Sequence, residues 1–292
     1  MQQVKVRVPG SCGELIQGQL DGQDFLISCP VNLYSQAKVK LLPETNKIKL
    51  NKGFSKSYKA ARKTLEYYQL QGIGLEIEID SELLIGQGMA SSTADMAAVV
   101  SAIMLLINKK IDYKVLINIL LAIEPTDSIF LPGFYKFDHL NGQIIEKLGP
   151  LPEFDILIFS NNAAEINTLA FNNSDKIRSL KKSKEQSVNQ ALKYILTGIN
   201  TRSKKLIGQG MTLSSLAHQK ILPKTGLIKI NDLISDYQQI YGLNIAHSGN
   251  LIGLFIEPGF KNKKLIKNIE HNSDFKFYQR ARLISGGIER VI

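Results

Sequence analysis

Apolar and polar positions alternate along much of the first 80 residues, a pattern typical of β-strands. The alternation is clear over residues 4–8, and it returns over residues 75–80 with an acidic side chain at every second position. Shorter apolar runs at 26–27 and 37–42 predict further strands, whereas residues 55–69 predict a helix. This part of the chain therefore predicts a largely β region.

The pattern changes after residue 85, where helical segments become longer. Residues 91–108 predict an Ala/Val/Ile/Leu-rich helix, and Ser91, Ser92 and Thr93 offer N-cap side chains for it. A second helix covers 113–124 and stops at Pro125, because the residue before a proline avoids the helical region. Beyond it, the pattern predicts strands at 154–159, 250–256 and 281–284, and helices at 174–197, 203–218 and 230–241.

Interleaved strands and helices predict an α+β fold. A chain of 292 residues suits one large domain or two intimately packed ones, and no low-complexity linker divides it. The strand at 154–159 plausibly opens a second half, so we expect two units, 1–150 and 151–292.

Composition excludes several classes of protein. No apolar run is long enough to span a bilayer, and the N-terminus lacks a signal-peptide core, so we expect a cytoplasmic protein. Two cysteines, Cys12 and Cys29, make neither a disulfide framework nor a zinc site. The net charge is +10, and most of the excess lies beyond residue 150. Its densest run is Lys176, Arg178, Lys181, Lys182 and Lys184.

The basic run has two interpretations, a nucleic-acid contact or a solvated helix face. Interleaved aromatic residues and a zinc or RNP signature are absent from the sequence, which favours the solvated face. We therefore expect no nucleic-acid partner and no membrane partner.

The most informative segment is a glycine-containing loop that enters the long helix. It consists of Gly86, Gln87, Gly88, Met89, Ala90, Ser91 and Ser92. Glycines let backbone approach a ligand closely, and a helix N-terminus with nearby hydroxyls suits a phosphate or the shell of Mg²⁺. The lysine of a Walker A motif is absent. An ordinary capped helix is the alternative interpretation.

Three carboxylates are the candidates for chemistry. Glu124 and Asp127 flank Pro125 at a helix end, which suits metal binding and general-base work as well as a solvent-exposed terminus. Glu14 is the lone charge between residues 9 and 20. It could pair with the ammonium group of an amino acid, or it could be a turn residue facing water.

Three ordered segments resemble the motifs of the GHMP kinases. The loop from Gly86 to Ser92 resembles the second motif, which wraps ATP phosphates, with Met89 in place of the usual leucine. Residues 9–18, PGSCGELIQG, stand where the first motif lies, and 246–250, AHSGN, resemble the third. Both of these forms are similar to the L-threonine kinases of cobalamin synthesis, the propanediol-utilisation type.

This resemblance implies a fold, a reaction and a set of site residues. The fold has two lobes, a ribosomal-S5-like N-terminal half and a ferredoxin-like C-terminal half. The reaction converts ATP and L-threonine to ADP and O-phospho-L-threonine, the precursor of the aminopropanol linker of cobalamin. The implied metal ligands for Mg²⁺ are Ser92 and Glu124, and Asp127 is the implied base or acceptor anchor. The implied acceptor-binding residues are Ser11, Glu14, His247 and Ser248.

The sequence leaves the acceptor and the assembly open. Serine and homoserine are alternative acceptors, because one methyl group discriminates by only about 1–3 kcal/mol. A basic nucleic-acid-binding protein on an S5-like fold is the alternative from another class, and a homodimer is compatible with either. After Phe159 the threonine kinases carry paired glycines, where this chain has Asn161, Asn162, Ala163 and Ala164, although the later run 168–172 survives.

Overall fold

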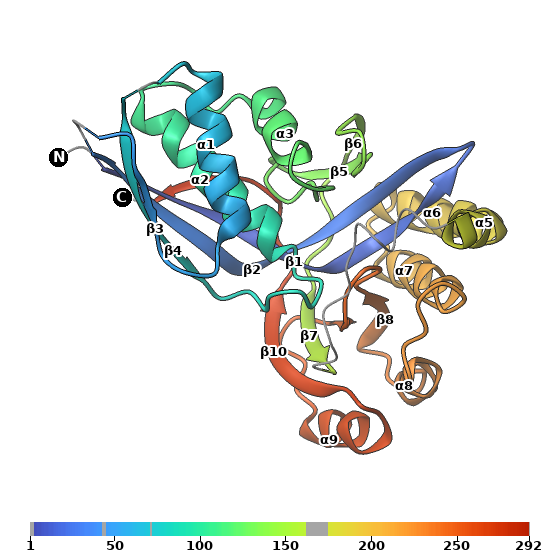
Figure 1. Cartoon of the computed structure of the whole chain (residues 1–292). Coiled ribbons are helices and arrows are strands. Elements are labelled where there is room, and N and C mark those ends of the chain that lie inside the picture. The colour runs from blue at the N-terminus through green and yellow to red at the C-terminus, as the bar shows by residue number, and fades with distance from the viewer. Residues whose placement is uncertain (1–2, 43–44, 71, 162–174, 292) are drawn as a thin grey trace.

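The computed structural model describes residues 3–42, 45–70, 72–161 and 175–291, with side chains of the last range described from residue 179. Figure 1 shows the whole chain. The departure at 162–164, the run 168–172 and the side chains of Lys176 and Arg178 lie outside the described part.

Two long strands run through the whole fold. β1 (Gln3–Leu20) and β2 (Gln23–Leu42) pair as an antiparallel hairpin that reaches from the N-terminal lobe to the C-terminal helices. The sequence predicted shorter, separate strands here. The alternation of apolar and polar side chains breaks because both faces of the hairpin are covered between Pro9 and Ile16.

A single sheet path connects the described strands. Its order is β10-β7-β9-β8-β1-β2-β4-β3, with β11 on β1 and the pair β5–β6 on β2. The strands beyond the hairpin are β3 (Ile48–Leu50), β4 (Gly74–Ser81), β5 (Phe134–Phe137), β6 (Ile144–Leu148), β7 (Asp155–Ser160), β8 (Ile240–Ile245), β9 (Leu251–Ile256), β10 (Lys276–Arg282) and β11 (Glu289–Val291).

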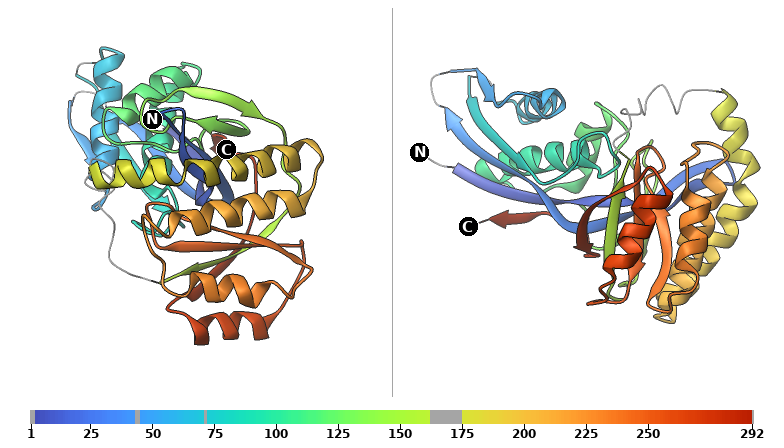
Figure 2. Two further views of the ribbon diagram at one scale, coloured as in Figure 1. Left: turned by 90° about the vertical axis from the view of Figure 1, so that its right-hand side faces the viewer. Right: turned by 90° about the horizontal axis from the view of Figure 1, so that it is seen from below.

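Helices cover this sheet in two groups. α1 (Ser55–Tyr67), α2 (Ser91–Leu106) and α3 (Tyr113–Leu121) lie over the N-terminal strands. The helices α5 (Asp175–Ser183), α6 (Glu185–Asn200), α7 (Lys204–His218), α8 (Leu227–Ile234) and α9 (Lys263–Asn272) lie in the C-terminal lobe. Figure 2 shows the C-terminal helices stacked beside β7 to β10, and both termini at the far end of the N-terminal lobe.

The predicted α+β fold is confirmed, and most elements lie where the sequence predicted them. α2 is buried around almost its whole circumference, because Ala, Val, Ile and Met occupy nearly every position after its first turn. The helix predicted at 174–197 is instead two helices that meet at Lys184. Several short elements were not predicted: β3, β5, β6, β8, β11 and α9.

Strand β8 of the C-terminal lobe meets the N-terminal hairpin at one residue pair. Glu14 of β1 pairs with Ile245 of β8, and this pair joins β8 to the hairpin within the described sheet. The division into units 1–150 and 151–292 stays a prediction. The junction nevertheless places Glu14 between the two lobes.

Candidate active site

Three segments that are far apart in the sequence meet beside this junction. The amide of Ser11 donates to the carbonyl of Met89 at 2.9 Å, and the amide of Asn250 donates to the carbonyl of Gln87 at 2.8 Å. A Cβ atom at Gly88 would lie 2.1 Å from that of Ala246, so only glycine permits this approach. The loop 86–92 is therefore held between β1 and the turn 246–250.

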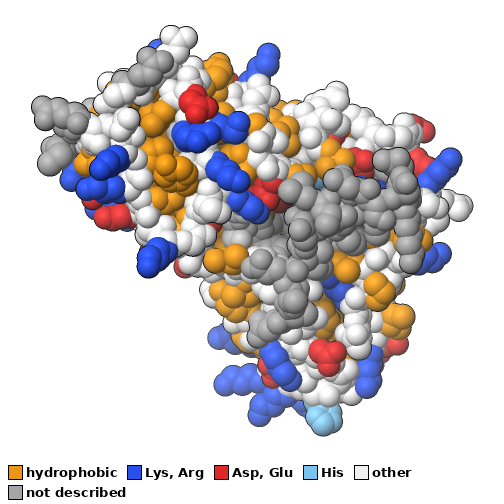
Figure 3. Space-filling model, in the orientation of Figure 1, with side chains coloured by type: hydrophobic (Ala, Val, Ile, Leu, Met, Phe, Trp, Pro, Cys, Tyr) orange, Lys and Arg blue, Asp and Glu red, His pale blue; other side chains and the backbone are white. Residues whose placement is uncertain are grey.

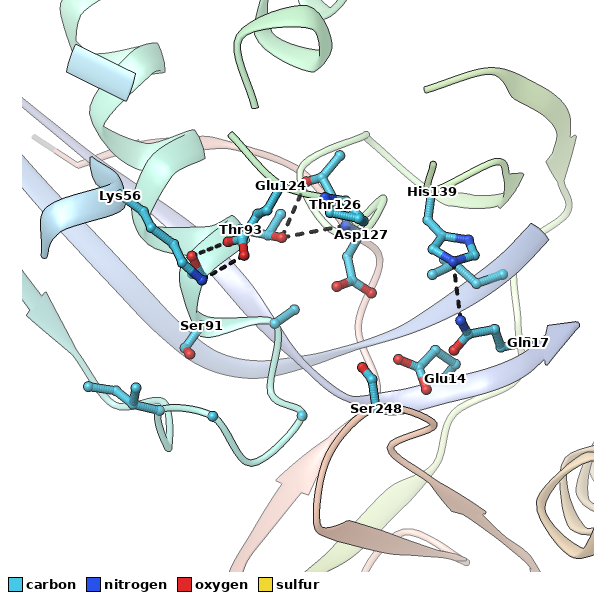
Figure 4. A pocket seen from close by; sticks show the side chains of 17 residues that line it. Glu14, Gln17, Lys56, Ser91, Thr93, Glu124, Thr126, Asp127, His139 and Ser248 are labelled. Atoms are coloured by element: carbon cyan, nitrogen blue, oxygen red, sulfur yellow. Dashed lines mark hydrogen bonds and ion pairs between the residues drawn. The ribbon is translucent and has the colours of Figure 1, made fainter. Parts of the chain in front are cut away.

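Together these segments and α1 line an open pocket of about 210 Å³. Figure 4 shows the side chains that face it. The predicted site residues in its lining are Gly86, Gly88, Ala90, Ser91, Ser92, Glu124, Asp127, Glu14 and Ser248.

The start of α2 differs from the capped helix expected from the sequence. The N-cap residue is Ala90, which adopts a left-handed conformation with φ of 53° and makes no side-chain cap. The hydroxyls that could have capped the helix point elsewhere: Ser92 donates to Glu124, and Thr93 accepts from Thr126 at 3.2 Å. Residues 90–93 line the pocket, and the first amides of a helix have no intrahelical partner, so this end of α2 suits an anion.

Glu124 lies at one end of the pocket between a hydroxyl and a cation. Its Oε1 accepts from Ser92, and its Oε2 accepts from Nζ of Lys56 at 2.6 Å. Lys56 comes from the first turn of α1, and half of its side chain is exposed. In the described lining of the pocket, Lys56 is the only lysine or arginine.

Asp127 faces the middle of the pocket. Its Oδ1 accepts from the hydroxyl of Ser28 at 3.2 Å, and its amide contacts the hydroxyl of Thr93 at 3.5 Å. The pKa of Asp127 is raised to about 7, first because burial removes water from the carboxylate and then because Glu14 repels it. Near neutral pH this carboxylate is therefore poised between its charged and neutral forms.

Glu14 lies at the opposite end of the pocket from Lys56. Gly13 has a φ of 57°, and the register of β1 against β2 shifts on both sides of Glu14. Such bulges turn a side chain out of its regular direction, here into the pocket. Figure 4 shows the carboxylates of Glu14 and Asp127 pointing toward the same space, with Ser248 beside them.

Glu14 is buried, which is inconsistent with a turn residue facing water. Its Oε2 accepts from the backbone amide of His247 at 2.9 Å and contacts the ring Nδ1 of His247 at 2.8 Å. Burial raises the pKa of Glu14 to about 7, although the amide of His247 and two lysines, Lys224 and Lys184, oppose that rise.

At two positions the structure contradicts the interpretation of the basic run as a solvated helix face. Lys181 pairs with Asp24 at 2.9 Å and is largely covered, and Lys184 is 4% exposed. Only Lys182 of the three described lysines faces solvent. The sequence could not reveal this difference, because burial depends on how α5 and α6 pack against β1.

Four predicted site residues lie outside the pocket lining. The hydroxyl of Ser11 donates to the carbonyl of Gly13 and accepts from the amide of Cys29, so it fixes the local turn. Gln87 and Met89 hold the loop through their carbonyls, and His247 lies behind Glu14. Their direct contacts with a ligand stay predictions.

The structure adds residues that sequence reasoning missed. Lys56, Thr93, Gln17 and His139 line the pocket, and the ring Nε2 of His139 lies 3.2 Å from Nε2 of Gln17. Burial lowers the pKa of His139 to about 4, which leaves its ring neutral at pH 7. Thr93 adjoins the predicted loop and could have been found there, whereas Lys56 stands in a segment without a motif.

Comparisons with known proteins agree with the motifs. Residues 55–130 match the family model described as GHMP kinases N terminal domain. An L-threonine kinase of Salmonella typhimurium is 31% identical over 250 residues, which cover 85% of this chain and 81% of that protein. An L-threonine kinase of Citrobacter freundii is 27% identical over 289 residues, covering 96% and 97%.

The fold agrees with solved structures at much lower identity. Homoserine kinase from Cytophaga hutchinsonii superposes with a TM-score of 0.71 at 16% identity, covering 100% of this chain and 98% of that one. No helix in the described ranges combines the length and apolar character that a bilayer crossing requires.

Proposed function

The chain belongs to the GHMP kinases, and on that premise we propose that it transfers the γ-phosphoryl group of ATP to the side-chain hydroxyl of L-threonine. One observation carries the proposal: a phosphate-type loop and a buried carboxylate, Glu14, face one pocket from opposite ends. The similarity to two L-threonine kinases supports the same acceptor. The product would be O-phospho-L-threonine, and the pathway would be synthesis of the cobalamin linker.

The loop end of the pocket suits the triphosphate of ATP. Backbone amides from Gly86 to Ser92 and the N-terminus of α2 would donate to phosphate oxygens. Lys56 would supply the positive charge that the loop lacks, by leaving Glu124 for a phosphate oxygen. Phosphoryl transfer needs positioning and charge neutralisation more than covalent help from protein, and these groups offer both.

The residues at this end also fit Mg²⁺. Ser92 and Glu124 bring a hydroxyl and a carboxylate into contact, and Mg²⁺ prefers one or two carboxylates together with phosphate oxygens and water. Within the described residues, no group of three or more acidic, histidine or cysteine side chains could hold a metal ion. We propose Ser92 and Glu124 as the ligands, and the ion would neutralise charge on the phosphates.

Asp127 is the proposed base. Its carboxylate would orient the threonine hydroxyl and accept its proton as the oxygen bonds to the γ-phosphorus and the bond to the ADP oxygen breaks. A base works best when its pKa lies near the working pH, and the pKa of Asp127 is raised to about 7. Thr93 and Ser28 hold the aspartate in place for this task.

Glu14 is the proposed partner of the acceptor's ammonium group. A buried carboxylate needs a compensating positive charge, and an α-ammonium group supplies one. Ser248 lies beside Glu14 and would add a hydroxyl contact to the acceptor. An amino acid is thus a better match for this end than a sugar or an isoprenoid alcohol.

An ADP-release assay tests the proposal with L-threonine, L-serine, L-homoserine and no acceptor. We expect L-threonine to have the highest kcat/KM and the product to be O-phospho-L-threonine by mass spectrometry. Homoserine is the specific rival, because the homoserine kinase superposes over the whole chain. A higher kcat/KM for homoserine would overturn threonine as the acceptor but would leave the assignment as a kinase intact.

A further inference from the structure

A buried lysine lies directly behind the acceptor end of the pocket. Lys184 stands where α5 ends and α6 begins, and it is 4% exposed. Its Nζ donates to the carbonyl of Gln17 at 2.9 Å and contacts Nδ1 of His218 at 3.1 Å. Both partners are uncharged, so no hydrogen-bonded carboxylate compensates the desolvation of this ammonium group.

The contacts continue from Lys184 to Glu14 in one chain. Nε2 of His218 lies 2.8 Å from the carbonyl oxygen of His247, and the amide of His247 donates to Glu14. The hydrogen-bond directions are mutually consistent. The carbonyl of His247 can only accept, so Nε2 of the neutral His218 ring donates to it, and Nδ1 accepts from Nζ of Lys184.

The ring of His247 completes the chain. Burial, followed by the charges of Lys184 and Lys224, holds the pKa of His247 well below its usual range, so the ring is neutral at pH 7. Nδ1 can then donate to Glu14 while Nε2 lies 3.3 Å from the hydroxyl of Ser214. One tautomer satisfies both contacts.

The same groups set the charge of Glu14. Lys184 and Lys224 both favour its ionised form, whereas burial disfavours it. The neighbouring negative charge is Asp127, whose own pKa is raised first by burial and then by repulsion from Glu14. Nζ of Lys224 donates to the carbonyl of Gly249, so Lys224 also fixes the turn 246–250. Lys184 acts at the acceptor end, through the chain described above.

A lysine that served only to fill space at this position would destabilise the fold. Removing an ammonium group from water costs several kcal/mol, and an apolar side chain of similar volume is often as stable or more stable. Burial, and then the charge of Lys181, lower the pKa of Lys184 to about 7, whereas Glu14 and Asp24 favour its charged form. A lysine kept in such a place calls for a role that a methionine would not perform.

We propose that Lys184 is a positioning residue for acceptor recognition, acting through His218 and His247 to hold Glu14 ionised and aimed at the ammonium group of the amino-acid acceptor. The inference rests on the proposed function, because it presupposes an amino-acid acceptor. It adds a second layer of residues, contributed by the C-terminal helices, to the acceptor site.

The test compares Lys184→Met, which removes the charge and both hydrogen bonds, with Lys184→Gln, which removes the charge and keeps a donor. Lys182→Met is the control, because Lys182 stands two residues away and faces solvent. Each variant is assayed for the KM values of L-threonine and ATP between pH 5.5 and 9, and for its melting temperature.

We expect Lys184→Met to raise the KM of threonine about tenfold or more while the KM of ATP stays within about twofold. In both Lys184 variants the acid limb of kcat/KM for threonine should move to higher pH by about half a unit or more, because a positive charge that favours ionised Glu14 is gone. Lys182→Met should match the wild type.

Two further measurements separate this role from a structural one. 3-Hydroxybutyrate lacks the ammonium group, so its low kcat/KM should change little in Lys184→Gln. An equal change for both acceptors, equal changes in both KM values or an unmoved acid limb would overturn the proposal. If Lys184→Met does not fold, Lys184→Gln decides by the same criteria. A wild type that does not phosphorylate threonine would instead refute the proposed function.

Discussion

A lysine and a glutamate lie at each end of the pocket, but the two pairs are arranged differently. At the loop end, Lys56 and Glu124 form a direct ion pair, and half of the lysine side chain is in contact with solvent. At the acceptor end, Lys184 and Glu14 are both buried and are connected through two histidines rather than by contact. The lysine of the first pair is half exposed, whereas Lys184 and Glu14 each have two hydrogen-bond contacts with buried groups.

This difference corresponds to the ligands that each end would receive. ATP brings several negative charges and a metal ion, so a solvated lysine can change partners at little cost. A free amino acid is small and brings one ammonium group, so a preorganised carboxylate lowers the cost of binding it. On the proposed function, contact with solvent would let the loop end adapt to its ligand, and exclusion of solvent would make the acceptor end selective.

The surface of the C-terminal lobe carries charged side chains that are neither buried nor paired within the pocket. Figure 3 shows lysine and arginine side chains over the lower end of the molecule, where α9 lies. Lys261, Lys263, Lys264 and Lys267 are exposed there. Such dispersed charges act through the long-range field, which is compatible with anionic nucleotides and does not require a nucleic-acid partner.

The largest effect is expected at the boundary between the two ends. Asp127→Asn should lower kcat by at least about tenfold, within the factor of about 10²–10⁴ that a positioned base contributes. The Mg²⁺ dependence of the remaining activity should change little, since Glu124 is intact. Single-turnover measurements at saturating ATP check this, and an unchanged kcat would remove Asp127 from the chemistry.

Glu14→Gln should break the acceptor end without disturbing the loop end. Glutamine keeps the size of the side chain but cannot neutralise an ammonium group, so the KM of threonine should rise by about ten- to a hundredfold. The KM of ATP should stay within about twofold. Steady-state kinetics with each substrate varied in turn provides the test, and parallel increases would show that the ends are not independent.

Acidification should weaken the acceptor end and the chemistry together. The pKa values of Glu14 and Asp127 are both raised to about 7, so each carboxylate is charged above that pH and protonated below it. Activity that needs both in the charged form is present above pH 7 and is lost as the pH falls. We expect kcat/KM for threonine to drop about tenfold or more between pH 8 and 6.

Two substitutions at the loop end should have smaller effects. Ser92→Ala should weaken the use of Mg·ATP by about three- to tenfold with an unchanged melting temperature, because one hydroxyl contact is lost. Glu124→Gln should shift the Mg²⁺ requirement upward. Titration of Mg²⁺ at fixed ATP measures both. If Asp127 instead controlled the metal requirement and Glu124 controlled kcat, the proposed roles would be exchanged.

The smallest effect is expected on the solvated surface. Lys182→Glu should leave turnover within about twofold of the wild type, because the side chain faces water beyond the pocket. The same reversal at Lys184 should raise the KM of threonine at least as much as Lys184→Met does. The difference between the two reversals therefore measures the effect of burial. Tight RNA binding by the wild type would instead indicate that the basic surface has a function of its own.

Several residues that the sequence singled out lie together in the structure. The loop from Gly86 to Ser92 enters α2 as expected, and Glu14, Asp127 and Ser248 face one pocket. Their candidate roles stay predictions. The sequence could single them out because glycines, hydroxyls and isolated carboxylates keep their chemistry wherever the chain places them. The N-cap assignment was wrong, because Ala90 takes a left-handed conformation and the hydroxyls bond to the segment after α3.

The sequence by itself determined the α+β class, the glycine-containing loop before α2 and the identity of the candidate carboxylates, since each rests on residues near one another in the chain. Tertiary structure decided which charges are buried. Lys182 and Lys184 are equivalent in a basic run, yet one faces solvent and the other lies behind Glu14. Lys56 and Glu124 became a pair only when α1 packed beside α2. The energy of a charge depends on the water and partners around it, and those are set by contacts between distant segments.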